Sequence, residues 1–326
     1  MLMQLFVTQL NVPQTPHLAF IAEQNLKFCS RFLRRKASAE WRRIMTKKRR
    51  KNIFARYNAF MKTGILNVFA YKFNVLSWLL VAASSLLCLF FLWLAVFNNS
   101  PVDVINGFTF KEIVAYTVII NIFAFTMGGG ETQDVITDEI QNGQIAMSLI
   151  KPISYRLRFI FSTFGSLIAS DLIVGFPLLI ISTIILTVNG YMTIKSPGHF
   201  ILILLFFLIA QVLAKWLYDV IGYIFGLISF YTMASFGLFQ IKDTIINFLS
   251  GTLIPIAFFP EWAGKIVNYL PFVGMAQNPT MIYLGKMNIN EALIAILMQV
   301  VWIAGLEIFA HFFYQKAIKI VIIQGG

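Results

Sequence analysis

Long apolar runs separated by short polar segments make up most of the chain after Lys72. A helix needs about 20 predominantly apolar residues to cross a bilayer, and we interpret six runs as such spans. The predicted spans are residues 73–97, 113–130, 159–188, 199–231, a fifth from a turn at 234–237 to Pro255, and 292–313. The pattern therefore predicts an all-α, polytopic membrane protein with six transmembrane helices.

The apolar stretch 199–253 is longer than one span and carries charged residues, including Lys215 and Asp219. We interpret it as two spans joined by the turn at 234–237. Lys215 and Asp219 are four residues apart, so on one helix they share a face and partly neutralise each other. A turn at 215–219 is the alternative, and it would change both the number of spans and the side of the membrane on which the chain ends.

Two further segments flank or interrupt the spans. In residues 53–68, apolar residues recur at helical spacing, which predicts an amphipathic helix along the inner membrane surface; a plain extension of the first span is the alternative. Residues 256–290 contain repeated prolines with Trp and Tyr between them, so they predict short helices at the outer surface instead of a straight span.

One long polar segment, residues 131–158, interrupts the apolar runs in the body of the chain. A polar residue before Glu139 can cap a short helix that has Glu139 in its first turn, and Gly143 offers a left-handed stop. Such a helix has little apolar surface for a core of its own, so we expect another protein to bind it. The candidate caps are Asp134, Thr137 and Asp138, and the candidate segment also includes Glu139, Gly143, Ile145, Lys151 and Pro152.

Composition agrees with a membrane protein, because 58% of residues are hydrophobic and only 12% are charged. Residues 1–72 hold 15 Lys and Arg against 2 acidic residues, whereas the remaining chain holds 11 against 12. The basic arm predicts a cytoplasmic N-terminus by the positive-inside rule and argues against a nucleic-acid surface over the whole fold. Six spans also place Lys316 and Lys319 on that side, so both termini are expected in the cytoplasm.

Residues 1–52 show no sustained helical or strand period, and we expect a basic extension that is disordered or dispensable before a membrane domain at 53–326. Met45 is followed by Thr-Lys-Lys-Arg-Arg-Lys, which is typical of the start of a membrane protein. We therefore expect residues 1–44 to lie upstream of the functional chain.

Sequence motifs for catalysis and metal binding are missing. The chain has no Gly-x-x-x-x-Gly-Lys-Ser/Thr, Gly-x-Ser-x-Gly or His-Glu-x-x-His pattern. Its three His residues are widely scattered, and its Cys29 and Cys88 are expected to be free thiols. The sequence therefore predicts no metal, no cofactor and no catalytic residue in this chain, and an energy source outside it.

Two groups of residues resemble the membrane permeases of ABC-2 type ABC exporters. The first runs from Phe248 to Trp262 and is followed by Leu-Pro-Phe at 270–272; in the family, a Ser-Gly near the end of the fifth span precedes spaced prolines and an extracellular re-entrant hairpin. The second, from Glu139 to Pro152, resembles the cytoplasmic segment before the third span. The hairpin residues that match are Ser250, Gly251, Pro255, Pro260, Trp262 and Pro271.

The resemblance covers the chain from Tyr57 onward and implies a permease subunit in the cytoplasmic (inner) membrane. It implies a separate ABC ATPase that binds ATP and Mg²⁺ and docks on the cytoplasmic coupling helix, and a second permease, identical or related. We expect export of an amphipathic compound, such as a drug, antibiotic, peptide or lipid-like molecule. The resemblance does not identify the substrate.

Ionisable residues inside predicted spans are candidates for function because they are costly in lipid. Asp171 lies in the third span and Glu307 in the last, with Lys215 as a candidate counter-charge and Asp219 near it. We expect these four residues either to line a transport path or to make hydrogen bonds between helices.

Two other classes remain open from the residues alone. An ion-coupled secondary transporter would show inverted repeats with broken helices near the midplane, and no repeat is visible. A membrane-embedded enzyme would need clustered acidic or His residues, whereas the acids here are scattered. A neighbouring gene for an ATPase would favour the exporter over both.

Overall fold

The computed structural model describes residues 53–70, 72–127, 131–151, 153–192, 197–232 and 236–324, and these are mostly helical. Contacts divide the chain into two units, Met1–Arg56 and Tyr57–Gly326. The elements below belong to the second unit, except for the first turn of α2 (Ile53–Ala70). The predicted extension at 1–52 lies outside the described residues.

Five helical stretches are long and apolar enough to cross a membrane. They agree with the first four predicted spans and with the last one, and α9 runs unbroken through 215–219, so the alternative of a turn there is wrong. The second stretch takes in residues 128–130, which the structure does not describe. The five are Leu79–Asn98 in α3 (Lys72–Asn98), Phe110–Gln141 in α4 (Phe110–Met127) and α5 (Glu131–Gln141), Tyr155–Val188, Phe200–Ile228 in α9 (Pro197–Ile228), and Ile289–Ile320 in α13 (Ile289–Gln324).

The predicted fifth span corresponds to α10 (Phe236–Leu249), which has 14 residues. At 1.5 Å per residue this helix is about 21 Å long, shorter than the about 30 Å of a bilayer core. The helix ends six residues before Pro255 because the chain leaves helical geometry at Gly251, where φ is +82°. Of the predicted turn at 234–237, residues 234 and 235 lie outside the described residues, whereas Phe236 and Gly237 already belong to α10.

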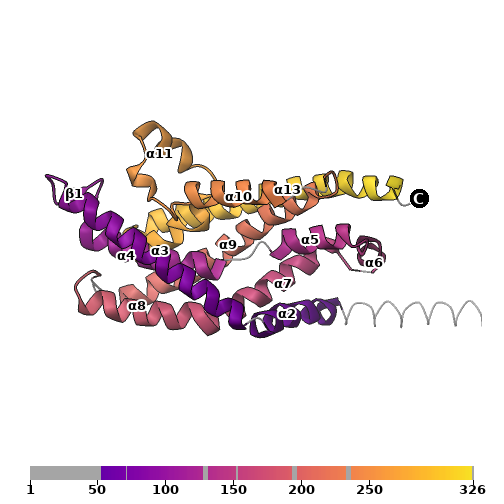
Figure 1. The fold of residues 1–326 in the computed structure, drawn as a ribbon, viewed down its shortest axis with the longest axis horizontal. Helices are drawn as coiled ribbons and strands as arrows, with labels where there is room; N and C mark the ends of the chain where they lie inside the picture. Colours follow the sequence, from indigo (N-terminus) through magenta and orange to yellow (C-terminus); the bar gives the residue numbers. More distant parts are fainter. Residues whose placement is uncertain are drawn as a thin grey trace, which may run out of the picture. The chain divides into compact units, whose positions relative to one another are not determined.

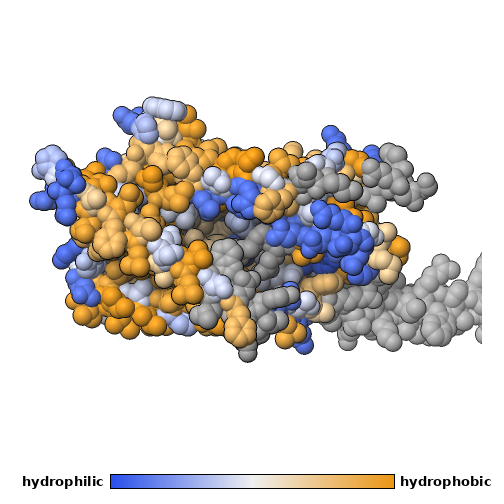
Figure 2. All heavy atoms as spheres, in the orientation of Figure 1, coloured by the Kyte–Doolittle hydropathy of each residue, from blue (hydrophilic) through white to orange (hydrophobic). Residues whose placement is uncertain are grey.

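Successive spans alternate between two ends of the second unit (Figure 1). One end holds the hairpin of β1 (Val104–Ile105) and β2 (Phe108–Thr109), the end of α8 (Phe176–Val188) and α11 (Glu261–Val267). The α5 helix, α6 (Ile145–Ile150) and the end of α13 lie at the other. Figure 2 shows hydrophilic residues near both ends and hydrophobic ones between them, as expected of helices that cross a bilayer.

The third span is one continuous helix with a wide turn in its middle. It consists of α7 (Tyr155–Ser170), the π-helical turn η1 (Asp171–Gly175) and α8 (Phe176–Val188). Pro177 has no backbone N–H and so cannot continue the regular hydrogen-bond ladder. Gly175 beside it reduces the steric cost of the irregular turn. The π turn therefore has a local cause in the sequence.

Buried apolar residues form two main clusters along α9. One surrounds the first half of α9 and includes Ile119, Phe123 and Phe207. The other surrounds its second half and includes Leu217 and Tyr223. The α9 helix is therefore the common core element against which both ends of the bundle pack.

Glycines allow α2 to pack directly against α7. A Cβ atom at Gly64 would overlap the carbonyl oxygen of Ser162, and one at Gly165 would overlap that of Met61. Tyr57 also stacks on Phe161 of α7, with ring centroids 5.1 Å apart. The helix predicted at 53–68 is thus present, and it is held along the first turns of the third span.

The segment between α10 and α13 consists of short helices, as predicted. These are η2 (Ile256–Phe258), α11 (Glu261–Val267), η3 (Val273–Met275) and α12 (Gln277–Tyr283). The β1–β2 hairpin was not predicted. Asn106 and Gly107 form its turn with φ values of 48° and 82°, a geometry that Asn-Gly favours.

Candidate functional site

The polar segment at 131–158 folds as α5, a turn and α6 (Ile145–Ile150), followed by Lys151 and then α7. Gly143 has φ +67°, so the predicted left-handed stop is confirmed. The predicted caps are wrong, because α5 already begins at Glu131 and all three candidates lie inside it. Glu139 consequently lies near the C-terminal end of α5 instead of in its first turn. Pro152 lies outside the described residues.

Glu139 ties α5 to both α6 and α7. Its carboxylate accepts hydrogen bonds from Arg158 at 2.8 and 3.0 Å, a two-pronged ion pair, and from Ser148 of α6 at 2.9 Å. The hydroxyl of Tyr155 donates at 3.0 Å. The Arg158 guanidinium also lies 4.4 Å from the centroid of the Phe159 ring. Three elements therefore meet at one carboxylate, and bidentate charge-assisted bonds are among the strongest in proteins.

Asp219 of α9 is bound by α5 and α7 together. Its Oδ1 accepts from Thr132 of α5 at 2.5 Å and from Thr163 of α7 at 2.8 Å. Its Oδ2 pairs with Arg156 at 2.6 Å. The Asp219 side chain is only 3% exposed, so this pairing is needed to offset the cost of burying the charge.

Arg156 extends the same network to the last span. Its guanidinium contacts Glu307 of α13 at 2.7 Å and lies 4.7 Å from the centroid of the Tyr223 ring. Trp216 of α9 donates to the same carboxylate at 2.8 Å. A single cation on α7 thus joins α9 and α13, and Glu307 is not left as an isolated charge.

The remaining buried polar residues of α5 contact further helices. Gln133 accepts from Lys242 of α10 at 2.6 Å, and Thr137 shares a hydrogen bond with Ser229 after α9 at 2.8 Å. Close approach is possible because α9 has Gly226 opposite Ile136 and Gln133. We call α5 with its partners Glu139–Arg158, Thr132–Asp219 and Gln133–Lys242, together with Arg156 between Asp219 and Glu307, the polar hub. It joins α5 to α6, α7, α9 and α10, and through Arg156 to α13.

The α6 helix has a buried side and an exposed apolar side. Ile145, a predicted site residue, and Ser148 are buried against the bundle. Met147 and Ile150 are 69% and 79% exposed, and Lys151 is exposed beside them. The α6 helix lies at the end of the unit where α5 and the end of α13 also lie (Figure 1). Exposed apolar residues in such a setting are typical of a protein contact.

Asp171 and Lys215 lie apart from the hub. Asp171 is in the π turn of the third span and accepts from Gln211 of α9 at 2.9 Å. Lys215 donates to the carbonyl oxygen of Met127 at 2.8 Å, at the end of α4. Both side chains are buried. The four charged residues predicted inside the spans therefore divide into two sets, with Asp219 and Glu307 sharing Arg156.

The predicted hairpin residues surround a tight turn after α10. Tyr116 of α4 donates to the carbonyl oxygen of Gly251 at 2.9 Å, and Ser250 and Pro271 are buried. Pro255 and Pro260 immediately precede η2 and α11. Trp262 is 71% exposed on α11. The sequence did not predict the contact with Tyr116, because 135 residues separate the two partners.

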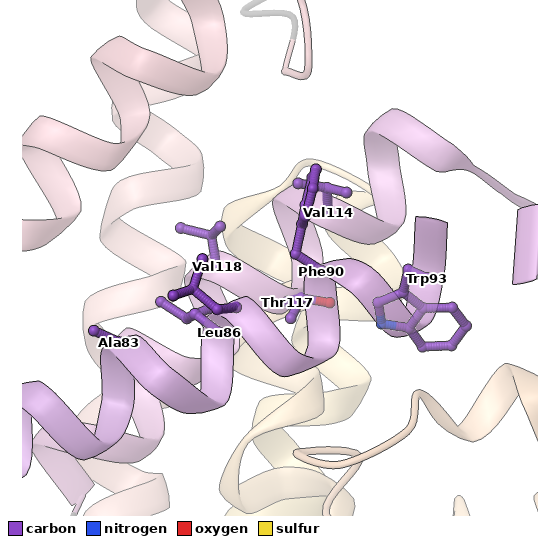
Figure 3. Close-up of a pocket in the computed structure, with 8 residues that line it drawn as sticks. Ala83, Leu86, Phe90, Trp93, Val114, Thr117 and Val118 are labelled. Atoms are coloured by element: carbon purple, nitrogen blue, oxygen red, sulfur yellow. The ribbon is translucent and has the colours of Figure 1, made fainter. Parts of the chain in front are cut away.

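A pocket of about 410 Å³ opens between α3 and α4. Figure 3 shows Leu86 and Phe90 of α3 facing Val114 and Val118 of α4. Its lining is almost entirely apolar. Thr117 contributes a hydroxyl, but this hydroxyl donates to the carbonyl oxygen of Ile113. The pocket therefore suits an apolar ligand. Within the described residues, no cluster of three or more His, Cys, Asp or Glu could hold a metal ion.

Sequence reasoning missed Arg156 and Arg158 as partners of the acidic residues. Their position at the start of an apolar span was a usable signal, because a charge at such a place needs a partner or a polar surface.

Comparison with known proteins identifies the family. The family model described as ABC-2 family transporter protein matches residues 83–325, which is most of the chain. No curated protein and no solved structure matches. The match includes α5, α6 and all elements of the polar hub. The chain therefore belongs to the ABC-2 transporter family and is an ABC-type membrane permease.

Proposed function

We propose that this permease is the membrane subunit of an ATP-driven exporter, and that a separate ABC ATPase docks on α6. The observation that carries the proposal is the exposed pair Met147 and Ile150 on a six-residue helix. A helix this short is not stable by itself, and Ser148 ties it to the Glu139–Arg158 pair. The α6 helix therefore presents an apolar patch and is itself held in place by the Glu139–Arg158 pair. ATP and Mg²⁺ bind on the partner.

The polar hub supports a path for the power stroke. A displacement of α6 acts on α7 through Arg158 and on α5 through Glu139. The α5 helix in turn holds α9 through Thr132 and Asp219, and Arg156 extends this link to α13. Because ion pairs have discrete arrangements, such a network can switch between two states. The spans then move from inward-open to outward-open.

We further propose six crossings, with α10 as the short fifth one and both termini in the cytoplasm of the cell. The α2 helix would lie at the inner surface, and residues 256–290 would lie on the outer side as short helices of a re-entrant hairpin. In a chain without Cys29 and Cys88, an impermeant thiol reagent added outside cells should label cysteines at Ser196 and Lys265. It should not label cysteines at Ser148 or Lys316. Labelling of Lys316 from outside would overturn the six-span topology.

Residues 1–44 of the basic extension are proposed to be dispensable for transport. A protein translated from Met45 should insert and transport at a near-normal rate. Loss of transport with normal insertion would assign a role to the arm.

A second permease, identical or related, is proposed to face α10. Gln240, Thr244 and Asn247 are exposed along α10, although polar side chains are unfavourable against lipid. Ile241 and Ile245 are exposed beside them. A polar stripe with apolar margins is better suited to line a transport path between two permeases than to face lipid. Lipids would cover the other exposed apolar faces.

The apolar pocket between α3 and α4 supports an amphipathic substrate. Its volume of about 410 Å³ is within the about 300–1,000 Å³ of small-molecule sites. Its lining suits an aliphatic or aromatic portion and leaves the polar portion of the compound outside.

The test combines two disruptions of the coupling segment with a repair. Glu139→Lys opposes Arg158 with a like charge, and Gly143→Val forces a β-branched residue to positive φ. Both variants should insert normally but lose ATPase co-purification or transport-coupled ATP hydrolysis. The charge swap Glu139→Arg with Arg158→Glu should restore part of the coupling that Glu139→Lys removes. Normal coupling in both single variants would leave the segment as a connecting loop.

The docking surface has its own matched control. Met147→Asp and Ile150→Asp should prevent ATPase binding, whereas Val102→Asp, at a residue 54% exposed near the β1–β2 hairpin, should leave it unchanged. Binding that survives both α6 changes would place the ATPase elsewhere.

A further inference from the structure

The middle of the third span has a buried carboxylate in an irregular turn. Asp171 begins the π turn, and the backbone N–H of Phe176 donates to its carbonyl oxygen. Single π turns inside helices are rare and occur frequently at functional sites. The polar hub uses the first turns of α7, so this turn is a separate feature of the same span.

Two acceptor atoms at this turn have no donor. Asp171 is 7% exposed and Gln211 is 3% exposed. Gln211 Nε2 donates to Asp171 Oδ2 at 2.9 Å, but within the described residues Asp171 Oδ1 and Gln211 Oε1 have no hydrogen-bond partner. A buried carboxylate with an open oxygen is costly. This cost is reduced by a group that donates a hydrogen bond to the open oxygen, or by neutralisation of the carboxylate charge.

The space around Asp171 Oδ1 is small. A Cβ atom at Gly175 would lie 3.0 Å from this oxygen and 2.8 Å from Thr126 Cγ2. The hydroxyl of Thr126 lies near the Asp171 carboxylate, but it donates to the carbonyl oxygen of Phe123 at 2.9 Å. On this side the oxygen therefore occupies room that a side chain at position 175 would fill. A proton needs no further room.

The charges nearby leave one negative charge in excess. Lys215, Asp219 and Asp171 are buried, and Arg156 and Glu307 are partly buried beside them, so two cations face three carboxylates. The other buried cations, Arg158 and Lys242, pair with Glu139 and Asp243. Asp219 and Glu307 are both paired with Arg156. Lys215, one turn from Gln211 on α9, attracts the Asp171 carboxylate and donates to Met127.

The other helices that contact the π turn add no titratable group near it. The sequence of α8 contains none, and the titratable residues of α4 and α7 are confined to their first two turns. Lys215 is therefore the charged residue that α9 brings to Asp171, while Arg156 is engaged in the hub.

We propose that Asp171 is a proton-binding site within the third span. When protonated, its carboxyl donates to the side-chain oxygen of Gln211, whose amide can rotate to present that oxygen. When ionised, it pairs with Lys215, which then leaves the end of α4. Proton uptake therefore replaces the contact between Asp171 and Lys215 with a hydrogen bond from Asp171 to Gln211, and proton release reverses this exchange. Both contacts join α9 to the third span. In the exporter proposed above, on which this last step rests, one state of the cycle carries the proton and the other does not.

Infrared spectroscopy of the permease alone in lipid nanodiscs tests proton binding without any partner. A carboxylic-acid C=O band should appear as the pH falls, be absent in Asp171→Asn and remain in Asp103→Asn, a change in an exposed loop. Asp171→Glu should keep a band, which guards against a folding defect. A band unchanged in Asp171→Asn, or one that responds to Na⁺ at constant pH and not to pH, would overturn the proposal.

The pH profile of transport-coupled ATP hydrolysis tests the coupling. Asp171→Asn should flatten the profile, whereas Asp103→Asn should keep it. If the band titrates but no ATPase binds, proton binding stands and the exporter proposal fails. A pH profile unchanged by Asp171→Asn, together with normal ATPase binding, would show that the proton is not part of the cycle.

Discussion

Two regions hold this permease together with different chemistry. Around α5, buried contacts use charge, as in Glu139–Arg158 and Asp219–Arg156. At the turn after α10, the contacts are neutral: Tyr116 donates to Gly251, and Gln277 Oε1 accepts from the N–H of Ile256 at 2.8 Å. Charged contacts between side chains can exchange partners, whereas bonds to the backbone fix one geometry. The first region suits movement and the second suits a fixed frame.

The largest effect should come from Arg156→Met. It leaves the carboxylates of Asp219 and Glu307 without their shared cation, and removing one partner of a buried pair costs about 3 to 5 kcal/mol. Thermal unfolding in detergent, followed by tryptophan fluorescence, should show a marked loss of stability. Arg156→Met combined with Asp219→Asn and Glu307→Gln should recover much of it. Equal stability of the single and triple variants would mean that the charges are not the cause.

Gln277→Leu should produce a smaller loss in the neutral region. The N–H of Ile256 then loses its acceptor, at a cost of about 1 to 3 kcal/mol. The ratio of transport to ATP hydrolysis should stay at the wild-type value, because this region does not move in our proposal. A change in that ratio would break the distinction between a moving region and a fixed one.

Tyr116→Phe removes one neutral hydrogen bond and keeps the ring in place. The loss should be about 1 kcal/mol, measured by the same unfolding assay. Coupling should again be unaffected. A loss comparable to that of Arg156→Met would show that the turn at Gly251 depends on this hydroxyl as strongly as the hub depends on its charges.

The smallest effect is expected at the exposed pair Glu261 and Lys265 on α11, 2.7 Å apart. The side chains of Glu261 and Lys265 are 86% and 73% exposed and gain little from pairing, because water screens the charges. Lys265→Ala should leave stability within measurement error. A clear loss would indicate that α11 is covered by a partner.

The sequence predicted the spans well because apolar run length is a local property. It also predicted the stop at Gly143, since a single glycine can terminate a helix. The caps of α5 were wrong because the first turn of the helix is already buried at Thr132 and Gln133. Their hydrogen bonds to Asp219 and Lys242 hold this turn in the helix, and those partners are far away in the sequence.

The ion pairs of the hub were beyond sequence reasoning. Arg156 lies 63 residues from Asp219 and 151 from Glu307, so only the packing of α7, α9 and α13 selects these partners. The π turn had a signal that was overlooked: Gly175 and Pro177 stand together in the middle of an apolar run. Asp171 was recognised as unusual, but its contact with Gln211 depends on the register between two spans.

The glycine contact between α2 and α7 makes α2 a suitable place for a label that reports movement of α7. Because Gly64 and Gly165 bring the two backbones into contact, a shift of α2 along α7 would bring bulkier residues into that contact, so we expect the two helices to move together. Lys62 is exposed on α2, and Asp103 is exposed directly before β1, which lies at the hairpin end of the unit (Figure 1). The distance between spin labels at these two positions would report how far α2 and α7 are displaced relative to the β1–β2 hairpin in each step of the cycle. Neither label alters a residue of the hub.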